Sequence, residues 1–94
     1  LPVVEAEQRK RAAQFRLNLL KDGFFMFQFS AYARHCASKE EAEVHKARVR
    51  SFLPPEGSVG ILLLTDRQFA EMEVFYGRRR EDPPSPGPRQ LELF

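Results

Sequence analysis

The stretch from Phe24 to Cys36 constrains the fold of this chain most, because it is rich in aromatic residues and contains neither glycine nor proline. Its side chains alternate with a period of two, which is typical of a β-strand. Both faces of this strand are largely apolar, so each must be covered by helices or by a second subunit. The stretch is longer than the usual strand of about 5–6 residues. We therefore predict that it bends, or that it breaks near Gln28–Ser30 into two shorter strands.

Two helices are predicted, one before and one after this stretch. Strong helix formers predict the first from Glu5 to Lys21, and Asp22-Gly23 ends it. Its apolar stripe consists of Ala12, Phe15, Leu19 and Leu20. Ser38 and Glu41 form a capping-box pattern that opens the second helix, which stops at Pro54-Pro55. One face of the second helix carries Ala42, His45, Val49, Phe52 and Leu53.

The remaining segments are shorter. The continuous apolar run from Val59 to Leu64 predicts a fully buried central strand. Thr65 caps a short helical turn that extends to about Glu71, and Met72 to Tyr76 predicts a further strand. Residues 78–89 are rich in arginine and proline and are predicted to form a linker. Residues 90–94 alternate again, which predicts a C-terminal strand at a sheet edge, of the same subunit or of a partner.

This order of elements predicts an α+β fold. One strand ahead of Leu1 would complete the β-α-β-β-α-β plan of a ferredoxin-like sandwich, so the first strand is expected to be missing from this chain. Residues 1–77 would form the domain. A sandwich of this size with apolar strand faces on both sides is expected to form a symmetric homodimer that covers them.

The composition excludes several classes of protein. With 43% hydrophobic and 30% charged residues, the chain is not wholly disordered. No apolar run approaches the ~20 residues that cross a bilayer, so no membrane association is expected. The single cysteine, Cys36, cannot form an internal disulfide, and one thiol is too few ligands for a cysteine-built zinc site. We expect a cytoplasmic protein.

Clustered basic residues are the one positive chemical signal. They are Arg9, Lys10, Arg11 and Arg16 in the first helix and Arg78, Arg79 and Arg80 after the last core strand. Guanidinium groups match phosphate oxygens, and such contacts give affinity without reading a base sequence. The phenylalanines lie in core-patterned segments, so duplex backbone binding is favoured over base stacking. The alternative is a solvated surface that keeps a small protein in solution.

Motifs for catalysis are absent from the sequence. It has no phosphate-cradling glycine loop, no GxSxG, no HExxH and no calcium-loop spacing. His35 and Cys36 are adjacent and would point to opposite faces of a strand. His45 is expected to be a hydrogen-bonded histidine at the core edge, and Asp66 a first-turn helix residue. We therefore assign no catalytic residue and no metal ligand.

Several segments, taken in order, resemble the Cas2 family of CRISPR-associated proteins in its type II form. The most specific of them is the strand that follows Gly23, with its Gln28-x-Ser30-x-Tyr32 pattern. The similar segments run nearly from end to end of the chain: residues 1–4, 15–16, 19–26, 28–34, 53–59, 63–69, 72–73 and 90–94.

The resemblance implies a ferredoxin-like fold and an obligate homodimer that acts in the acquisition of new spacers. Members of the family bridge two dimers of the CRISPR integrase and contact the phosphates of the captured duplex protospacer. The basic residues above would serve that task. The dimer interface is expected to include Gln28, Ser30 and Tyr32, together with the tail residues Leu91, Leu93 and Phe94.

The resemblance also implies an alternative, since some members are magnesium-dependent endonucleases that act on RNA or DNA. Their metal-binding aspartate, at the end of the first strand, falls directly before the position of Leu1. Mg²⁺ is therefore possible in an intact member, but no cofactor is expected in this chain. A third hypothesis is a ferredoxin-like interaction module without a nucleic-acid role.

Overall fold

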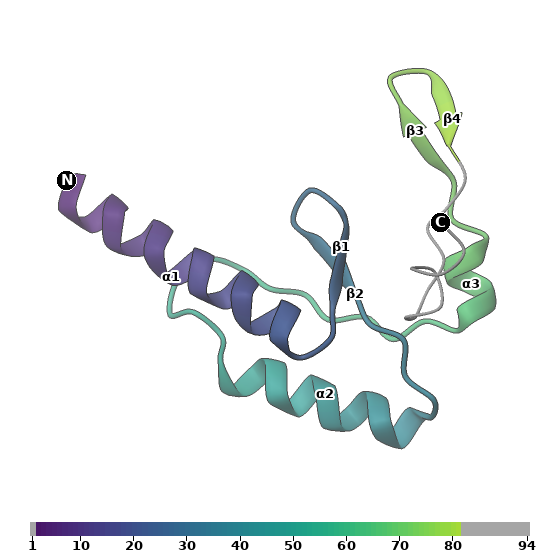
Figure 1. Ribbon diagram of the computed structural model, residues 1–94, viewed down its shortest axis with the longest axis horizontal. Helices are drawn as coiled ribbons and strands as arrows, with labels where there is room; N and C mark the ends of the chain where they lie inside the picture. The colour runs from purple at the N-terminus through teal and green to yellow at the C-terminus, as the bar shows by residue number, and fades with distance from the viewer. Residues whose placement is uncertain (1, 82–94) are drawn as a thin grey trace.

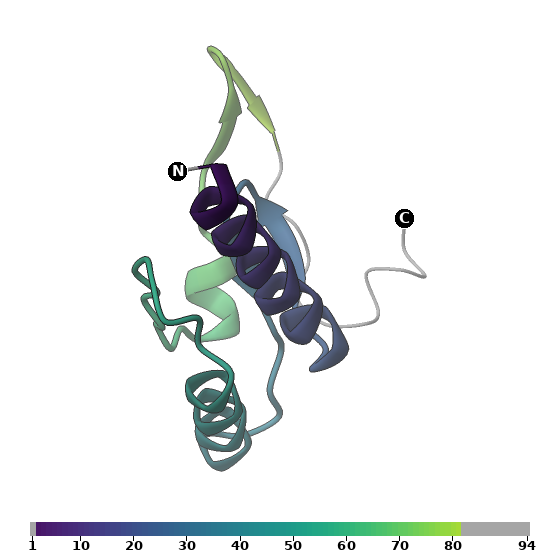
Figure 2. The ribbon, with the colours of Figure 1, turned by 90° about the vertical axis from the view of Figure 1, so that its left-hand side faces the viewer.

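The computed structural model describes residues 2–81. In that range the chain forms three helices and two antiparallel hairpins, which confirms the α+β class (Figure 1). The elements, in order, are α1 (Pro2–Lys21), β1 (Phe25–Gln28), β2 (Ala31–Ala33), α2 (Lys39–Ser51), α3 (Asp66–Ala70), β3 (Val74–Tyr76) and β4 (Arg79–Glu81). Helices α1 and α2 lie with the β1–β2 hairpin in one half, and the β3–β4 hairpin projects beyond the rest of the molecule (Figures 1 and 2).

Helix α1 begins three residues earlier than predicted, because a proline is tolerated in the first turn, where no intrahelical donor is needed. It ends where the sequence predicts. Gly23 has a φ of 92°, and the amide of Phe24 donates to the carbonyl of Leu19 at 3.0 Å. The left-handed φ favours glycine at this position, and a Cβ on Gly23 would also lie only 3.0 Å from Nε of Arg34 and crowd that side chain.

The predicted break near Gln28–Ser30 is confirmed. Strands β1 and β2 form an antiparallel hairpin whose register shifts between Met26 and Gln28. Ser30 adopts a φ of 62° in the turn between them. The single long strand that the aromatic alternation suggests is therefore folded back on itself.

Helix α2 starts at the predicted cap. The Ser38 hydroxyl accepts from the Glu41 amide at 3.1 Å, and the Glu41 carboxylate accepts from the Ala37 amide at 2.7 Å. Of the predicted apolar face, Ala42, His45 and Val49 are buried. Phe52 packs against Phe15 of α1 with ring centroids 5.7 Å apart. Leu53 is 43% exposed because it lies beyond the end of the helix.

The prediction of a buried strand from Val59 to Leu64 is wrong. These residues form no strand, and all are exposed, with Leu62 80% accessible. A strand is made by hydrogen bonds to a neighbour, and within residues 2–81 no strand lies beside this segment. The apolar side chains of this segment would be buried only against another strand or helix, and residues 2–81 do not supply one.

Helix α3 follows this segment, and Thr65 caps it as the sequence predicts; in the structure the cap is a reciprocal capping box with Gln68. The Thr65 hydroxyl accepts from the Gln68 amide at 3.1 Å, and the Gln68 side chain accepts from the Thr65 amide at 2.9 Å. Phe69 is buried edge-to-face against Phe25 and Phe27. The other buried side chains within residues 2–81 are Val74, Leu19, Ala42, His45 and Val49.

The structure differs from the expected linker at its start, because Arg79–Glu81 form strand β4. Gly77, with a φ of 59°, occupies the first position of a two-residue turn that folds β4 back onto β3. The composition of so short a segment does not reveal a strand, because the strand is formed by hydrogen bonds to β3. The C-terminal strand predicted for residues 90–94 lies outside the described residues, and the ferredoxin-like sheet and the dimer stay predictions.

Candidate nucleic-acid interface

Helix α1 places three of the predicted phosphate-binding residues on its exposed surface. Arg9, Lys10 and Arg16 are all exposed, and none forms an ion pair with a carboxylate of residues 2–81. At about 100° per residue, Arg9 and Arg16 are two helical turns apart on the same side. We call these three residues the outer cations. They offer hydrated positive charge that a phosphate backbone can neutralise.

Arg11, the fourth predicted contact in this helix, has a different role. Its Nη2 donates to Oε1 of Glu56 at 2.8 Å, and its Nε lies 3.1 and 3.2 Å from the two carboxylate oxygens. This fork holds α1 against the turn that follows α2. The hydrogen bond raises the pKa of Arg11 and lowers the pKa of Glu56 from its ordinary value. Arg11 is therefore part of the scaffold.

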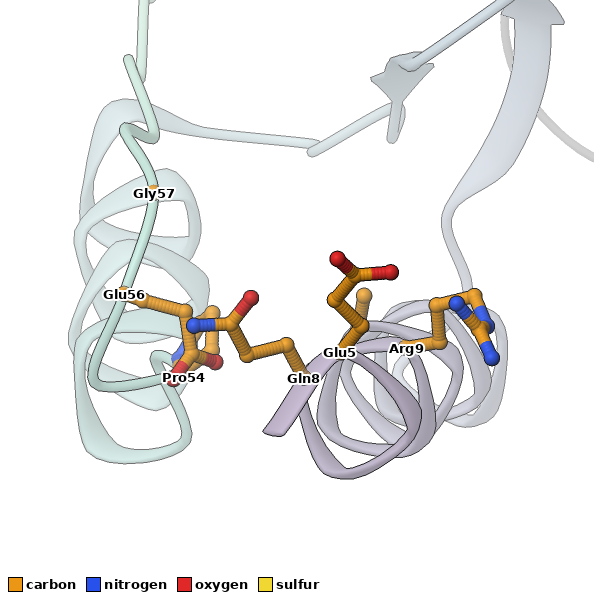
Figure 3. A pocket seen from close by; sticks show the side chains of 7 residues that line it. Glu5, Gln8, Arg9, Pro54, Glu56 and Gly57 are labelled. Carbon is orange, nitrogen blue, oxygen red and sulfur yellow. The ribbon is translucent and has the colours of Figure 1, made fainter. Parts of the chain in front are cut away.

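A shallow cavity of about 400 Å³ lies beside this ion pair (Figure 3). In the close-up the Arg9 side chain points away from the turn that carries Glu56, whereas Gln8 points toward that turn. The cavity is lined by Glu5, Gln8, Arg9, Ala12, Pro54, Glu56 and Gly57. Its two carboxylates make it unsuited to a phosphate, so the outward side of α1 is the better candidate interface.

The second basic cluster lies on the β3–β4 hairpin and is partly neutralised. Nη2 of Arg79 is 2.9 Å from Oε1 of Glu81, and Nη1 of Arg80 is 3.6 Å from Oε2 of Glu73. These pairs are largely exposed to solvent, so each contributes little to stability. Arg78 occupies the turn and has no ion pair with a described residue. In Figure 1 this hairpin and the start of α1 lie toward opposite ends of the molecule, so the structure does not bring the two clusters together.

The predicted dimer residues lie on the β1–β2 hairpin. Gln28 precedes the turn and Ser30 lies in it, both exposed, and Tyr32 is half-buried opposite Met26. The neighbouring Phe29 is 93% exposed. Gln28 also borders a second open cavity of about 360 Å³, between this hairpin and β3. Leu91, Leu93 and Phe94 lie outside the described residues.

A buried ionic cluster joins the end of α1 to α2, and sequence reasoning did not identify it as a unit. Nδ1 of His45 lies 2.7 Å from Oδ2 of Asp22, and Nη1 of Arg48 donates to Oδ1 of Asp22 at 3.0 Å. Burial raises the pKa of Asp22, but the hydrogen bonds from His45 and Arg48 outweigh this and hold the pKa below its ordinary value. His45 is thus the hydrogen-bonded core histidine that the sequence predicts.

Arg34 extends this cluster to the β1–β2 hairpin. Its Nε donates to the carbonyl of Asp22 at 2.8 Å, and its Nη1 donates to the carbonyl of His35 at 2.7 Å. The same nitrogen lies 3.4 Å from the Glu41 carboxylate. The amide of Ala37, followed by the charge of Arg34, lowers the pKa of Glu41. No local pattern indicates the contacts of Arg34 with Asp22 and Glu41, because these residues belong to separate elements.

Residues 2–81 do not match a magnesium site. No three side chains among His, Cys, Asp and Glu come together in this range, whereas Mg²⁺ requires clustered oxygen ligands. The nearest arrangement is an exposed pair, with Nδ1 of His35 3.3 Å from Oδ1 of Asp66. Asp66 is the first residue of α3, as predicted. We therefore derive no metal-dependent step from the described residues.

Comparison with known proteins places these features in a family. Residues 3–72 match the family model of the CRISPR associated protein Cas2. Over its full length the chain is 51% identical to the CRISPR-associated endoribonuclease Cas2 of Flavobacterium psychrophilum, covering 81% of that protein. It is 47% identical to the protein of the same name from Parvibaculum lavamentivorans, covering 92% of it. Another protein of that name, from Ligilactobacillus salivarius, is 39% identical over 99% of this chain and 92% of its own length.

Between residues 2 and 81, no helix combines the length and the apolar character needed to cross a membrane.

Proposed function

The chain belongs to the CRISPR-associated protein Cas2 family, and on that premise we propose that it is a non-catalytic subunit that holds duplex DNA during spacer acquisition. It would bridge dimers of the CRISPR integrase and contact the backbone of the protospacer duplex. The observation that carries this proposal is the set of outer cations, Arg9, Lys10 and Arg16, exposed along one helix.

Backbone contact follows from the chemistry of these groups. Guanidinium and ammonium groups release condensed counterions when they neutralise phosphates, which supplies affinity without base recognition. A helix is a rigid support, so Arg9 and Arg16 keep a fixed spacing along a groove or backbone. Arg78, in the turn of the β3–β4 hairpin, adds a further contact, while Arg79 and Arg80 would exchange exposed carboxylates for phosphates.

The proposal includes a ferredoxin-like arrangement completed in a symmetric homodimer. Large apolar side chains support it, since Phe29 is 93% and Leu62 is 80% exposed in the single subunit. Surfaces of this kind mark protein–protein contact. Gln28, Ser30 and Tyr32 would lie at the interface. Leu91, Leu93 and Phe94 would add a strand to the partner's sheet.

Duplex binding is tested with a double variant, Arg9→Ala with Arg16→Ala, titrated against a short DNA duplex at several salt concentrations. Each lost phosphate contact lowers the slope of log K against log salt by about 0.9. We expect the slope to fall by up to about 1.8. The control is Arg67→Ala, which removes an exposed arginine of α3 whose Nε lies 3.6 Å from the Glu71 carboxylate. An unchanged slope in the double variant, or an equal fall in the control, would refute the assignment.

A second candidate is phosphodiester cleavage, which is favoured by the names of the relatives as endoribonucleases. It is tested by incubating this chain with single-stranded RNA, with and without Mg²⁺ and a chelator. Chelator-sensitive turnover that persists through purification would establish it. If neither duplex binding nor turnover is observed, and the integrase does not co-purify, the chain is an interaction module without a nucleic-acid role.

A further inference from the structure

Helix α1 has a second apolar stripe, on the side opposite the core. The core side carries Phe15 and Leu19, of which Leu19 is only 5% exposed. Leu20, which the sequence assigns to the same stripe, is 50% exposed and lies on the outward side. The outward stripe advances along the helix in alternating steps of three and four residues, and none of its members is buried. We call it the outer seam; it consists of Val3, Ala6, Lys10, Ala13, Leu17 and Leu20.

The spacing of the outer seam is that of a coiled-coil contact. Alternating steps of three and four residues correspond to the a and d positions of a heptad, which face a partner helix when two helices wind together. Val3 is 73% exposed, and Leu17 and Leu20 are each 50% exposed. A helix that only covers a core has one apolar stripe and a polar outer side. The core therefore does not account for the outer seam.

The charges beside the seam define what can pair with it. In the heptad frame, Lys10 occupies a core position, Arg9 and Arg16 occupy g positions, and Glu7 and Lys21 occupy e positions. Four cations thus face one carboxylate. A second copy of α1 would oppose cations with cations, which is unfavourable at e and g positions. A helix with acidic e and g positions would neutralise them.

We propose that the outer seam of α1 binds an acidic amphipathic helix of another protein as a two-stranded coiled coil. The partner would present apolar side chains to Ala13, Leu17 and Leu20 and a carboxylate to Lys10. A polar core position of this kind sets the register of the two helices. Because Arg9, Lys10 and Arg16 are also the outer cations, the acidic helix and a DNA duplex compete for this side of α1.

The test uses a labelled synthetic peptide of three heptads with leucine at a and d, glutamate at e and g, and one glutamate in the central a position. Fluorescence anisotropy measures its binding to the full chain. The variant Leu17→Gln with Leu20→Gln should weaken binding at least about tenfold, since both side chains leave the apolar contact. Its affinity for duplex DNA should not change, which separates this proposal from the proposed function.

Two controls keep the outcome specific. Val4→Gln with Val44→Gln removes two side chains of similar exposure, 48% and 49%, that lie off the seam, and should not alter binding. Lys10→Glu should abolish binding of the acidic peptide and restore binding of a peptide with lysine in the central a position. Far-UV circular dichroism verifies that every variant retains its helices.

Several results would overturn the proposal. One is failure of the unaltered chain to bind the peptide, and another is equal binding of a scrambled peptide with the same composition. A third is a sedimentation measurement in which the unaltered chain self-associates and the Leu17 and Leu20 substitutions abolish this self-association. That result would show that the outer seam binds a second copy of this chain. Loss of duplex affinity in that variant would assign the seam to DNA instead.

Discussion

The two surfaces of α1 use the same residue types for opposite purposes. At the junction with α2 and its following turn, three arginines have protein acceptors: Arg48 pairs with Asp22, Arg34 donates to the Asp22 carbonyl, and Arg11 pairs with Glu56. On the outward side, Arg9 and Arg16 extend into solvent. The difference shows that a count of arginines does not locate a binding surface. Their carboxylate partners distinguish scaffold from interface.

The largest effect on stability is expected from Asp22→Asn. This substitution leaves His45 and Arg48 without the charge that both contact, in a site where the Asp22 side chain is only 10% exposed. Breaking such a pair is expected to lower the free energy of unfolding by roughly 2–3 kcal/mol. Urea denaturation measures it. A change below about 0.5 kcal/mol would show that the junction does not depend on this cluster.

The same cluster predicts how stability changes with pH. The folded pKa of Asp22 lies below its ordinary value of 3.8, so its ionised form contributes stability at pH values above 3.8. That contribution is lost as the pH falls through the lowered folded value. The stability difference between the unaltered chain and Asp22→Asn should therefore shrink as the pH falls below 3.8. A difference that does not depend on pH would contradict the ionic origin of the effect.

A smaller loss of stability is expected from Glu56→Gln, because the Arg11 fork is partly exposed to solvent. The variant should also bind duplex DNA more tightly, since Arg11 becomes available and a negative charge is removed. The salt slope should rise by up to about 0.9 for the added contact. Weaker duplex binding by this variant would mean that Arg11 contacts DNA in its paired geometry.

The smallest effect on stability is expected from Arg16→Ala. The side chain is exposed and forms no ion pair within the described segment, so the free energy of unfolding should change by less than about 0.5 kcal/mol. Duplex affinity should nevertheless fall. A stability loss as large as that of Asp22→Asn would remove the distinction between the two surfaces.

Local patterns predicted the parts of the fold that depend on neighbouring residues. The Ser38 and Thr65 caps, the stop at Gly23 and the break near Ser30 each depend on a few consecutive side chains, and the structure confirms them. The strand from Val59 to Leu64 was wrong because a strand depends on a distant partner. Strand β4 was missed for a related reason: its three residues are mostly arginine and depend on β3 for pairing.

The sequence predicts which residue types form the candidate site, but it does not predict which of the basic side chains are free of carboxylate partners within residues 2–81. The sequence indicated seven basic residues without separating them. Arg11 meets Glu56 across 45 positions, and Arg48 meets Asp22 across 26, which are distances that no periodicity reveals. The pairs of Arg79 and Arg80 with Glu81 and Glu73 depend on the hairpin turn at Gly77. The folded structure therefore separates the outer cations from the other four of the seven basic residues.

The most direct test of this selection is nuclear magnetic resonance of the arginine side chains during titration with a DNA duplex. The Nε–H signals of Arg9 and Arg16 should shift in proportion to the bound fraction, because phosphates approach them. The signal of Arg34, which is held by the Asp22 carbonyl, should stay in place. Shifts at Arg34 and Arg11 without shifts at Arg9 and Arg16 would contradict the account.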